Sequence, residues 1–246
     1  MLYIVATPIG NLEDITLRAL RILKEVDYIA AEDTRHVKIL LDKYEIHKPT
    51  ISFHAWSDER KLHELLAILS EGKSIALVSD AGTPGISDPG YVLVKAALEH
   101  KIPVTPIPGA SAFLTALSAS GLPINQFLYI GFLPLKKGRQ TAFKALQEEK
   151  RTIVFYESPH RIIKTLGECV QYFSGRTIVI GRELTKMFEE FFRGTPEEAL
   201  AYFKAKQPKG EFVIMIGAQE KGHHHEEEGD RHEKKGHRHD EEGDAE

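Results

Sequence analysis

The sequence predicts an α/β protein built from two α/β lobes. Short apolar segments of strand length alternate with amphipathic segments of helix length in both halves of the chain. A stretch with several Gly and Pro residues, 121–134, interrupts this alternation and indicates a crossing between lobes. The chain has 246 residues, enough for two modest cores. We therefore expect one lobe in residues 1–121 and the other in residues 122–220.

The first lobe has the pattern of a mostly parallel sheet with helices on both faces. Its strands are expected at residues 2–6, 28–31, 50–53, 74–79 and 103–107. Helices are expected between them at residues 16–24, 35–44, 58–71 and 91–100, and after the last strand at residues 110–120. Short buried strands joined by amphipathic helices are typical of parallel sheets.

The second lobe resumes the alternation. Its helices are expected at residues 140–149, 159–173 and 196–206, and its strands at residues 152–156, 177–180, 188–193 and 211–216. Ser158 and Pro159 indicate an N-cap followed by a first-turn proline. Thr195 and Glu198 have the spacing of a capping box.

Composition limits the classes of protein that this chain belongs to. No apolar run approaches the ~20 residues of a membrane span, and the first residues lack the basic segment of a signal peptide. The single cysteine, Cys169, excludes an internal disulfide and fits a reducing compartment. Its place on the apolar stripe of an expected helix indicates buried packing. We expect a cytoplasmic protein without a membrane partner.

Residues 221–246 form a tail of different composition. It is rich in His, Glu, Asp, Gly and Lys and nearly free of apolar residues, so we expect it to be disordered. It holds five Lys or Arg and ten Asp or Glu, which leaves residues 1–220 with a net charge of +1 within the total of −4. Its histidines favour weak binding of zinc or nickel. No metal site is expected in the ordered domains, where no His or Cys cluster has ligand spacing.

The most informative stretch is the central loop, residues 80–90, which follows an apolar strand. Five of its residues are Gly or Pro. Gly allows positive φ and close approach to the backbone, while Pro holds the loop shape. In open α/β sheets, ligands bind beyond the carboxyl ends of the strands, where such loops lie. A ligand-binding loop is therefore favoured over an elaborate turn.

Other polar loops follow the remaining strands, at residues 7–12, 31–35 and 108–112. Because the carboxyl ends of parallel strands meet at one edge of a sheet, we expect these loops and the central loop to wall one pocket. The sequence has neither G-x-x-x-x-G-K-[ST] nor G-x-G-x-x-G after the first strand, which argues against P-loop and Rossmann sites.

Six motifs in one order carry a family resemblance. They lie at residues 7–12, 32–35, 79–90, 108–112, 157–161 and 182–186. Together they resemble the small-subunit ribosomal RNA methyltransferase I family, part of the tetrapyrrole-methylase superfamily of class III S-adenosylmethionine (SAM)-dependent methyltransferases. The resemblance covers residues 1–217, and the tail inherits nothing from it. It implies SAM bound in a cleft between two α/β domains, a homodimer, and 2′-O-methylation of a cytidine ribose in the decoding region of small-subunit rRNA.

The resemblance also implies cofactor contacts. They fall on Pro8, Asp80, Ala81, Gly82, Thr83, Pro84, Ile86, Ser111 and Ala112 in the first domain, and on Tyr156 and Glu157 in the second. Many superfamily members carry Gly-Asp-Pro where this chain has Gly82-Thr83-Pro84, a departure that fits the rRNA branch better than the tetrapyrrole branch. SAM needs close backbone donors and acceptors, which Gly82 permits, and an apolar wall for adenine, which Ile86 can supply.

A ribose hydroxyl is a poor nucleophile, and general acid–base catalysis typically contributes ~10²–10⁴-fold. The candidate catalytic residues lie in polar loops: Glu157, His160, Asp33 and Arg35. An ordinary polar role in the first helical turn is the alternative for His160. A local ion pair or a helix cap is the alternative for Asp33 and Arg35.

RNA binding needs cations, which grip phosphates. The candidates are Lys136, Lys137 and Arg139 after the crossing, with Arg161, Arg182 and Lys186 in motif loops. A solvated surface run is the alternative for the first three. The expected substrate is the rRNA, in the assembled subunit.

Two other functions stay open. One is methylation of a tetrapyrrole or another small molecule on the same fold, although such a site needs more groups for several acidic substituents. The other is a non-catalytic RNA-binding or assembly factor, against which the intact Gly and Pro residues of the central loop argue.

Overall fold

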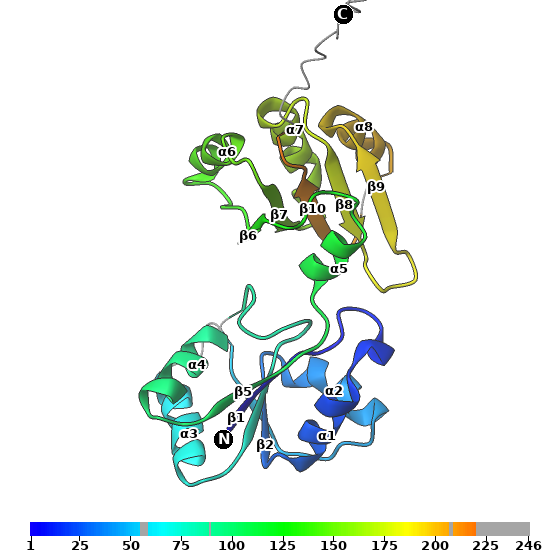
Figure 1. Cartoon of the computed structure of the whole chain (residues 1–246). Helices are drawn as coiled ribbons and strands as arrows, with labels where there is room; N and C mark the ends of the chain where they lie inside the picture. The colour runs from blue at the N-terminus through cyan, green and yellow to red at the C-terminus, as the bar shows by residue number, and fades with distance from the viewer. Residues whose placement is uncertain (55–58, 89, 207–208, 220–246) are drawn as a thin grey trace, which may run out of the picture.

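The computed structural model describes residues 1–54, 59–88, 90–206 and 209–219, and the tail expected from residue 221 lies outside them. The chain forms two lobes, one above the other in Figure 1, each with a five-stranded sheet. The predicted α/β class with two lobes is confirmed. Within the described residues, no helix is long and apolar enough to cross a membrane.

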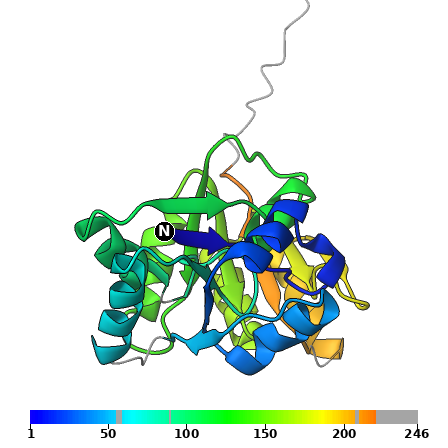
Figure 2. The ribbon, with the colours of Figure 1, turned by 90° about the horizontal axis from the view of Figure 1, so that it is seen from below.

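The lower lobe in Figure 1 is a parallel sheet, as the sequence predicts, and its strand order is β3-β2-β4-β1-β5. Its strands are β1 (Leu2–Val5), β2 (Tyr28–Ala31), β3 (Thr50–Ser52), β4 (Ile75–Val78) and β5 (Val104–Ile107). Helices α1 (Leu17–Glu25) and α2 (Thr34–Lys43) cover one face, and α3 (Glu59–Ser70) and α4 (Gly90–Glu99) the other. Figure 2 shows these two pairs on opposite sides of the sheet. All four residues of the central strand β4 are buried, because helices cover both faces.

The upper lobe is a mixed sheet in the order β6-β7-β10-β8-β9. Strands β6 (Phe127–Phe132) and β7 (Thr152–Glu157) are parallel, and the other neighbours are antiparallel: β8 (Ile178–Arg182), β9 (Glu190–Gly194) and β10 (Phe212–Ile216). One face packs under α6 (Arg139–Gln147), α7 (Ile162–Tyr172) and α8 (Pro196–Lys206). The short helix α5 (Ala112–Ser118) packs on the other face, toward the lower lobe.

The crossing between the lobes differs from the prediction in two ways. Strand β6 (Phe127–Phe132) lies inside the stretch expected to be a linker, because the Gly and Pro residues around it mark strand ends. Helix α5 packs mainly against β7 and β10 of the upper sheet. By packing, α5 therefore groups with the upper lobe.

Two expected helix starts have different outcomes. The capping box is confirmed: the Thr195 backbone N–H donates to Glu198 Oε2 at 2.8 Å, and the Glu198 N–H donates to Thr195 Oγ1 at 3.2 Å. The N-cap at Ser158 is wrong, because α7 begins at Ile162 and the Ser158 carbonyl accepts from Arg161 and Ile162 in a preceding turn. Cys169 is buried in the core under α7, as expected.

Candidate functional site

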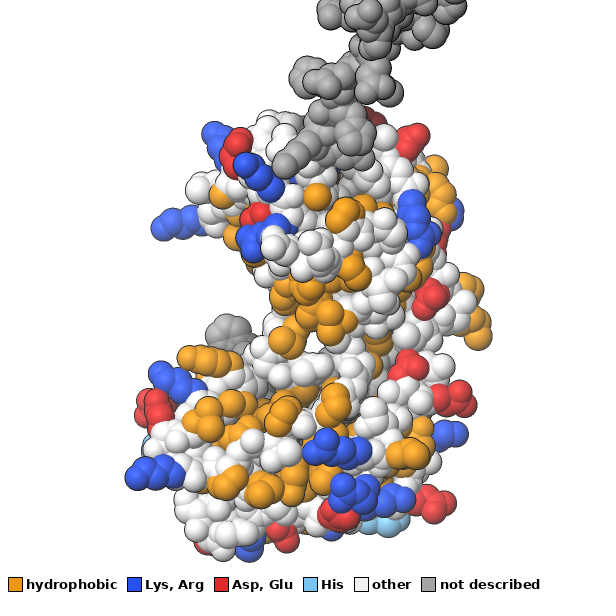
Figure 3. Space-filling model, in the orientation of Figure 1, with side chains coloured by type: hydrophobic (Ala, Val, Ile, Leu, Met, Phe, Trp, Pro, Cys, Tyr) orange, Lys and Arg blue, Asp and Glu red, His pale blue; other side chains and the backbone are white. Residues whose placement is uncertain are grey.

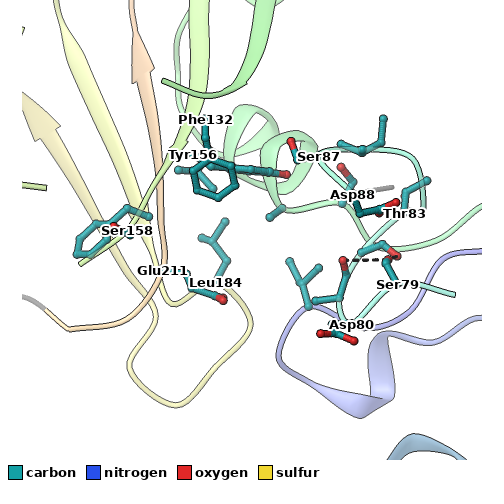
Figure 4. A pocket seen from close by; sticks show the side chains of 18 of the residues that line it. Ser79, Asp80, Thr83, Ser87, Asp88, Phe132, Tyr156, Ser158, Leu184 and Glu211 are labelled. Atoms are coloured by element: carbon teal, nitrogen blue, oxygen red, sulfur yellow. Dashed lines mark hydrogen bonds between the residues drawn. The ribbon is translucent and has the colours of Figure 1, made fainter. Parts of the chain in front are cut away.

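A cavity of ≈ 430 Å³ lies between the lobes at the carboxyl edge of the first sheet. Figure 4 shows Tyr156 and Leu184 of the upper lobe on one side, opposite Ser79, Asp80 and Thr83 of the lower lobe. In Figure 3 the surface is hollowed between the lobes, with hydrophobic side chains gathered on the underside of the upper lobe. Loops that follow β1, β2, β4 and β5 all contribute to the lining, which confirms that the strand-end loops share one pocket.

Hydrogen bonds tie three of these loops into one wall. Thr7 and Gly82 exchange backbone hydrogen bonds of 2.9 and 3.0 Å, and Thr7 Oγ1 donates to the Ser79 carbonyl at 3.1 Å. Thr83 Oγ1 donates to the Ala110 carbonyl at 3.2 Å. Gly82 has φ +80°, a conformation that favours glycine, and its backbone lies at the cavity wall. The central loop is thereby fixed to the loops after β1 and β5.

Two aspartates of the central loop are also engaged with the backbone. Asp88 Oδ1 accepts from the N–H groups of Gly85 at 2.7 Å and Gly90 at 2.8 Å, which closes the loop on itself. Asp80 Oδ1 accepts from the Asp33 N–H at 3.0 Å, which joins the loop to the start of α2. Both side chains line the cavity while they hold the loop.

Most of the residues expected at the cofactor line this cavity, namely Asp80, Ala81, Gly82, Thr83, Ile86, Ser111, Ala112, Tyr156 and Glu157. Pro8 and Pro84 are buried and are absent from the lining. Ile9, next to Pro8, lines the cavity instead. The structure therefore does not bring these two prolines to the cavity surface.

The upper lobe contributes an aromatic wall. The Tyr156 ring lies 5.5 Å from both the Tyr129 and the Phe132 ring centroids, and Phe132 is 52% exposed. Tyr156 Oη accepts from the Phe113 N–H at 3.3 Å. Burial, together with the neighbouring Tyr129, raises the pKa of the Tyr156 phenol well above its ordinary value. The phenol therefore stays protonated near neutral pH and does not act as a base.

Glu157 borders the cavity, but its carboxylate is fully buried and paired. It lies 2.7 Å from Arg161 and 3.7 Å from Arg139, and it accepts from Thr165 Oγ1 at 2.6 Å. Arg161 has Glu157 as its ion-pair partner, whereas the buried Arg139 also binds Glu168 at 2.6 Å. The structure therefore gives no support to Glu157 as a catalytic base and places it in an ion-pair network.

The other candidate catalytic residues lie outside the cavity lining. Asp33 caps α2 by accepting from the Arg35 N–H at 2.8 Å, and it pairs with the Arg35 guanidinium at 2.7 Å. Hydrogen bonds from Arg35 hold the pKa of the Asp33 carboxyl far below its ordinary value. The cap and local ion pair are thus what the structure shows, and the catalytic expectation finds no support. His160 is exposed in the turn before α7.

The cations expected to bind RNA fall into two groups. Arg139 is only 4% exposed and binds Glu168 at 2.6 Å, so the structure contradicts its expected contact with phosphates. Arg161, Arg182 and Lys186 each pair with a glutamate within the upper lobe. Lys136 and Lys137 are exposed, and neither forms an ion pair with any described residue.

Several lining residues were not among the expected site residues: Glu32, Ser87, Asp88, Phe132, Leu184 and Glu211. Glu32 and Asp88 lie inside motifs that the sequence analysis singled out. Their position at strand ends was the available signal. That the two carboxyl groups approach each other depends on the order of strands in the sheet.

Comparison with known proteins adds the family. Residues 1–200 match the family described as Tetrapyrrole (Corrin/Porphyrin) Methylases. Ribosomal RNA small subunit methyltransferase I of Thermotoga maritima is 48% identical, across 89% of this chain and 99% of the relative. This chain belongs to the ribosomal RNA small subunit methyltransferase I family.

Other members of the ribosomal RNA small subunit methyltransferase I family have a similar sequence identity to this chain. The Halalkalibacterium halodurans protein is 52% identical across 87% of this chain and 75% of the relative. The Escherichia coli O157:H7 protein is 49% identical across 92% of this chain and 79% of the relative. The identity thus extends over both lobes.

Solved structures show that this family member shares its fold with other methylases. Cobalt precorrin-4 methyltransferase has a TM-score of 0.67 at 16% identity, over 88% of this chain and 94% of the other. Uroporphyrin-III C-methyltransferase from Thermus thermophilus, solved with S-adenosylhomocysteine, has a TM-score of 0.61 at 20% identity, over 87% and 96%. These likenesses establish the tetrapyrrole-methylase fold.

Proposed function

We propose that this chain transfers a methyl group from SAM to the 2′-oxygen of a cytidine ribose in the decoding region of small-subunit rRNA. The observation that carries the proposal is the cavity itself: the motifs shared with the family lie on loops that line it from both lobes. The names of the similar proteins, small-subunit rRNA methyltransferases, support the substrate class. The family resemblance supports the ribose position.

SAM suits the cavity in size and chemistry. Small-molecule sites typically enclose about 300–1,000 Å³, and this cavity of ≈ 430 Å³ falls in that range. SAM carries a sulfonium and an ammonium group, and Glu32, Asp80 and Asp88 give the lower wall negative charge. Ile86 and the aromatic wall offer apolar surface for adenine. The neighbour solved with S-adenosylhomocysteine supports the same cofactor class.

Methyl transfer depends mainly on how the cofactor and the substrate are positioned. Methyl transfer proceeds in line, with the reacting atoms held about 3–3.5 Å apart. The hydrogen bonds among the loops after β1, β4 and β5 make the lower wall rigid enough to hold the cofactor in one pose. Target ribose and methyl donor would meet beneath the aromatic wall. Lys136 and Lys137, exposed between β6 and α6, would contact phosphates of the RNA.

The proposal includes the setting of the reaction. The substrate would be the assembled small subunit in the cytoplasm, and the active form a homodimer. Analytical ultracentrifugation of the full chain tests the dimer, because a sedimentation coefficient of the monomer at micromolar concentration would contradict it.

Labelled cofactor tests the function. Purified chain is incubated with tritiated SAM and, in parallel, small ribosomal subunits, naked rRNA and a tetrapyrrole precursor. Label in subunit rRNA that makes the next linkage resistant to alkali supports ribose methylation. Label on the tetrapyrrole would overturn the RNA assignment. Absence of SAM binding by calorimetry would overturn the enzyme assignment and favour an RNA-binding or assembly factor.

A further inference from the structure

Three carboxyl groups line the lower wall of the cavity, from Glu32, Asp80 and Asp88. Two of them are committed to the backbone: Asp88 holds Gly85 and Gly90, and Asp80 accepts from Asp33. Among the described residues, the hydrogen bond to Glu32 outside the strand pairing is one that Ser52 Oγ donates to its backbone carbonyl, while its carboxyl group has only longer-range electrostatic interactions, with Asp80, Asp88 and His54. Glu32 is half-buried, follows β2 directly and lines the cavity.

The surroundings of Glu32 favour its protonated form. Burial raises the pKa of the Glu32 carboxyl above its ordinary value, and Asp80 and Asp88 raise it further, against a smaller opposing effect of His54. A carboxylate of raised pKa is a stronger base than an ordinary one. Such shifts are common at groups that exchange protons with a substrate.

The other glutamates that line the cavity are in ion pairs. Glu157 pairs with Arg161 at 2.7 Å, and Glu211 pairs with Lys186 at 2.9 Å. The Tyr156 phenol stays protonated near neutral pH, because burial raises its pKa. Among the described lining residues, Glu32 is therefore the carboxylate free to accept a proton.

We propose that Glu32 is the general base that takes the proton of the hydroxyl group being methylated. This inference deepens the proposed function and rests on it. The hydroxyl oxygen forms a bond to the methyl carbon while the carbon–sulfur bond breaks. The electron pair of that bond stays on sulfur, which becomes a neutral thioether. The hydroxyl proton passes to the Glu32 carboxylate, which becomes a neutral carboxylic acid.

The charge balance of this step suits the site. The reactants include a sulfonium cation and the Glu32 carboxylate anion. The reaction converts them into a neutral thioether and a neutral carboxylic acid. No new charge is created in a half-buried cavity, where an unpaired charge is costly. Neutralising Glu32 also removes its repulsion with Asp80 and Asp88.

The competing role for Glu32 is to bind the ammonium group of SAM, and substitution separates the two roles. Hydrogen bonds to charged groups contribute about 1.5–3 kcal/mol, so removing such a bond to SAM would raise the Kd for SAM by more than about tenfold. Removing a general base instead lowers the methyl-transfer rate by ~10²–10⁴-fold and leaves that Kd within tenfold.

The experiment compares Glu32→Gln with a matched surface control, Glu99→Gln, at an exposed position of α4. Single-turnover methyl transfer to small subunits is measured across pH, with SAM affinity measured by calorimetry. We expect the wild-type rate to rise with pH and level off above the pKa of Glu32, and Glu32→Gln to lose that rise. Formate should restore part of the rate of Glu32→Ala, since a small carboxylate can enter the vacated space.

The outcomes are distinct. A rate of Glu32→Gln close to that of Glu99→Gln, or a rate loss explained entirely by weaker SAM binding, would overturn the role of Glu32. Wild-type chain that binds SAM but labels no RNA would instead overturn the proposed function. Retained far-ultraviolet circular dichroism and a cooperative thermal transition show that each variant is folded.

Discussion

Ser87 Oγ lies 2.7 Å from the hydroxyl oxygen of Tyr129, so a hydrogen bond joins the central loop of the lower lobe to strand β6 of the upper lobe. Tyr129 is held from behind by stacking on Phe113, with ring centroids 4.3 Å apart. Gly131 on the same strand leaves room for Ser87, since a Cβ there would lie 3.0 Å from Ser87 Oγ. The geometry of the cavity mouth therefore depends on contact between the lobes.

Substituting this pair tests the contact. Tyr129→Phe keeps the stacked ring and removes the hydrogen bond, so we expect it to lower the free energy of unfolding by about 0.5–1.5 kcal/mol. Ser87→Ala should have a similar effect, and the double variant should cost little more than either one. Urea denaturation measures all four proteins. Fully additive losses would show that the two hydroxyls do not interact in solution.

The buried network around Glu157 predicts a large loss of stability. Glu157→Gln removes the carboxylate partner of Arg161 and leaves Arg139 with Glu168 alone, and breaking a buried pair typically costs about 3–5 kcal/mol. The control is Glu25→Gln, which breaks an exposed pair with Arg21 and should cost about 0–1 kcal/mol. Equal denaturation midpoints for the two variants would refute a structural role for Glu157.

Glu190 predicts a pH dependence of stability. Burial alone would raise the pKa of the Glu190 carboxyl, but hydrogen bonds from Lys206, Tyr202 and Arg182 outweigh it and hold the pKa at about 2, below the ordinary 4.5. Because the folded-state pKa is depressed, this contribution is complete above pH 4.5 and is lost as pH falls toward 2. The stability of Glu190→Gln should therefore fall less steeply than that of wild type over this window. Parallel curves from urea titrations would contradict the shift.

The exposed lysines after the crossing predict a salt effect. Replacing Lys136 and Lys137 by Ala should weaken RNA binding and reduce the slope of log K against log salt by about 0.7 for each phosphate that is no longer neutralised. Filter binding of rRNA fragments at several salt concentrations gives the slope. The control, Lys24→Ala with Lys101→Ala, removes the same charge from exposed positions of the lower lobe. If both double variants change the slope equally, the effect is one of net charge.

Much of the lower lobe is predictable because its strands are short, apolar and bounded by turn residues. The parallel order then brings the loops after β1, β4 and β5 together, as the sequence analysis expects. Strand β6 (Phe127–Phe132) was missed because Gly and Pro flank it and Gly131 lies within it. Its strand conformation depends on pairing with β7 (Thr152–Glu157), which is distant in the sequence.

Side-chain roles in the site were less predictable, because long-range packing decides them. Lys136, Lys137 and Arg139 look alike as a basic run, yet only Arg139 turns inward to meet Glu168 on α7. Glu32 lies in a motif, but nothing local shows that Asp80 and Asp88 approach it. The sequence therefore predicted where the strand-end loops lie, but not which charged side chains pair or approach each other.

The central claim is that the cavity between the lobes holds SAM, and hydrogen exchange with S-adenosylhomocysteine bound tests it most directly. We expect slower exchange in peptides that cover residues 79–88, 111–113 and 154–158, because these segments contain cavity-lining residues from both lobes. Ala112→Trp, which fills the cavity, should abolish both binding and protection, while Ala67→Trp at an exposed position of α3 should not. Protection confined to other segments, with binding intact, would contradict this account.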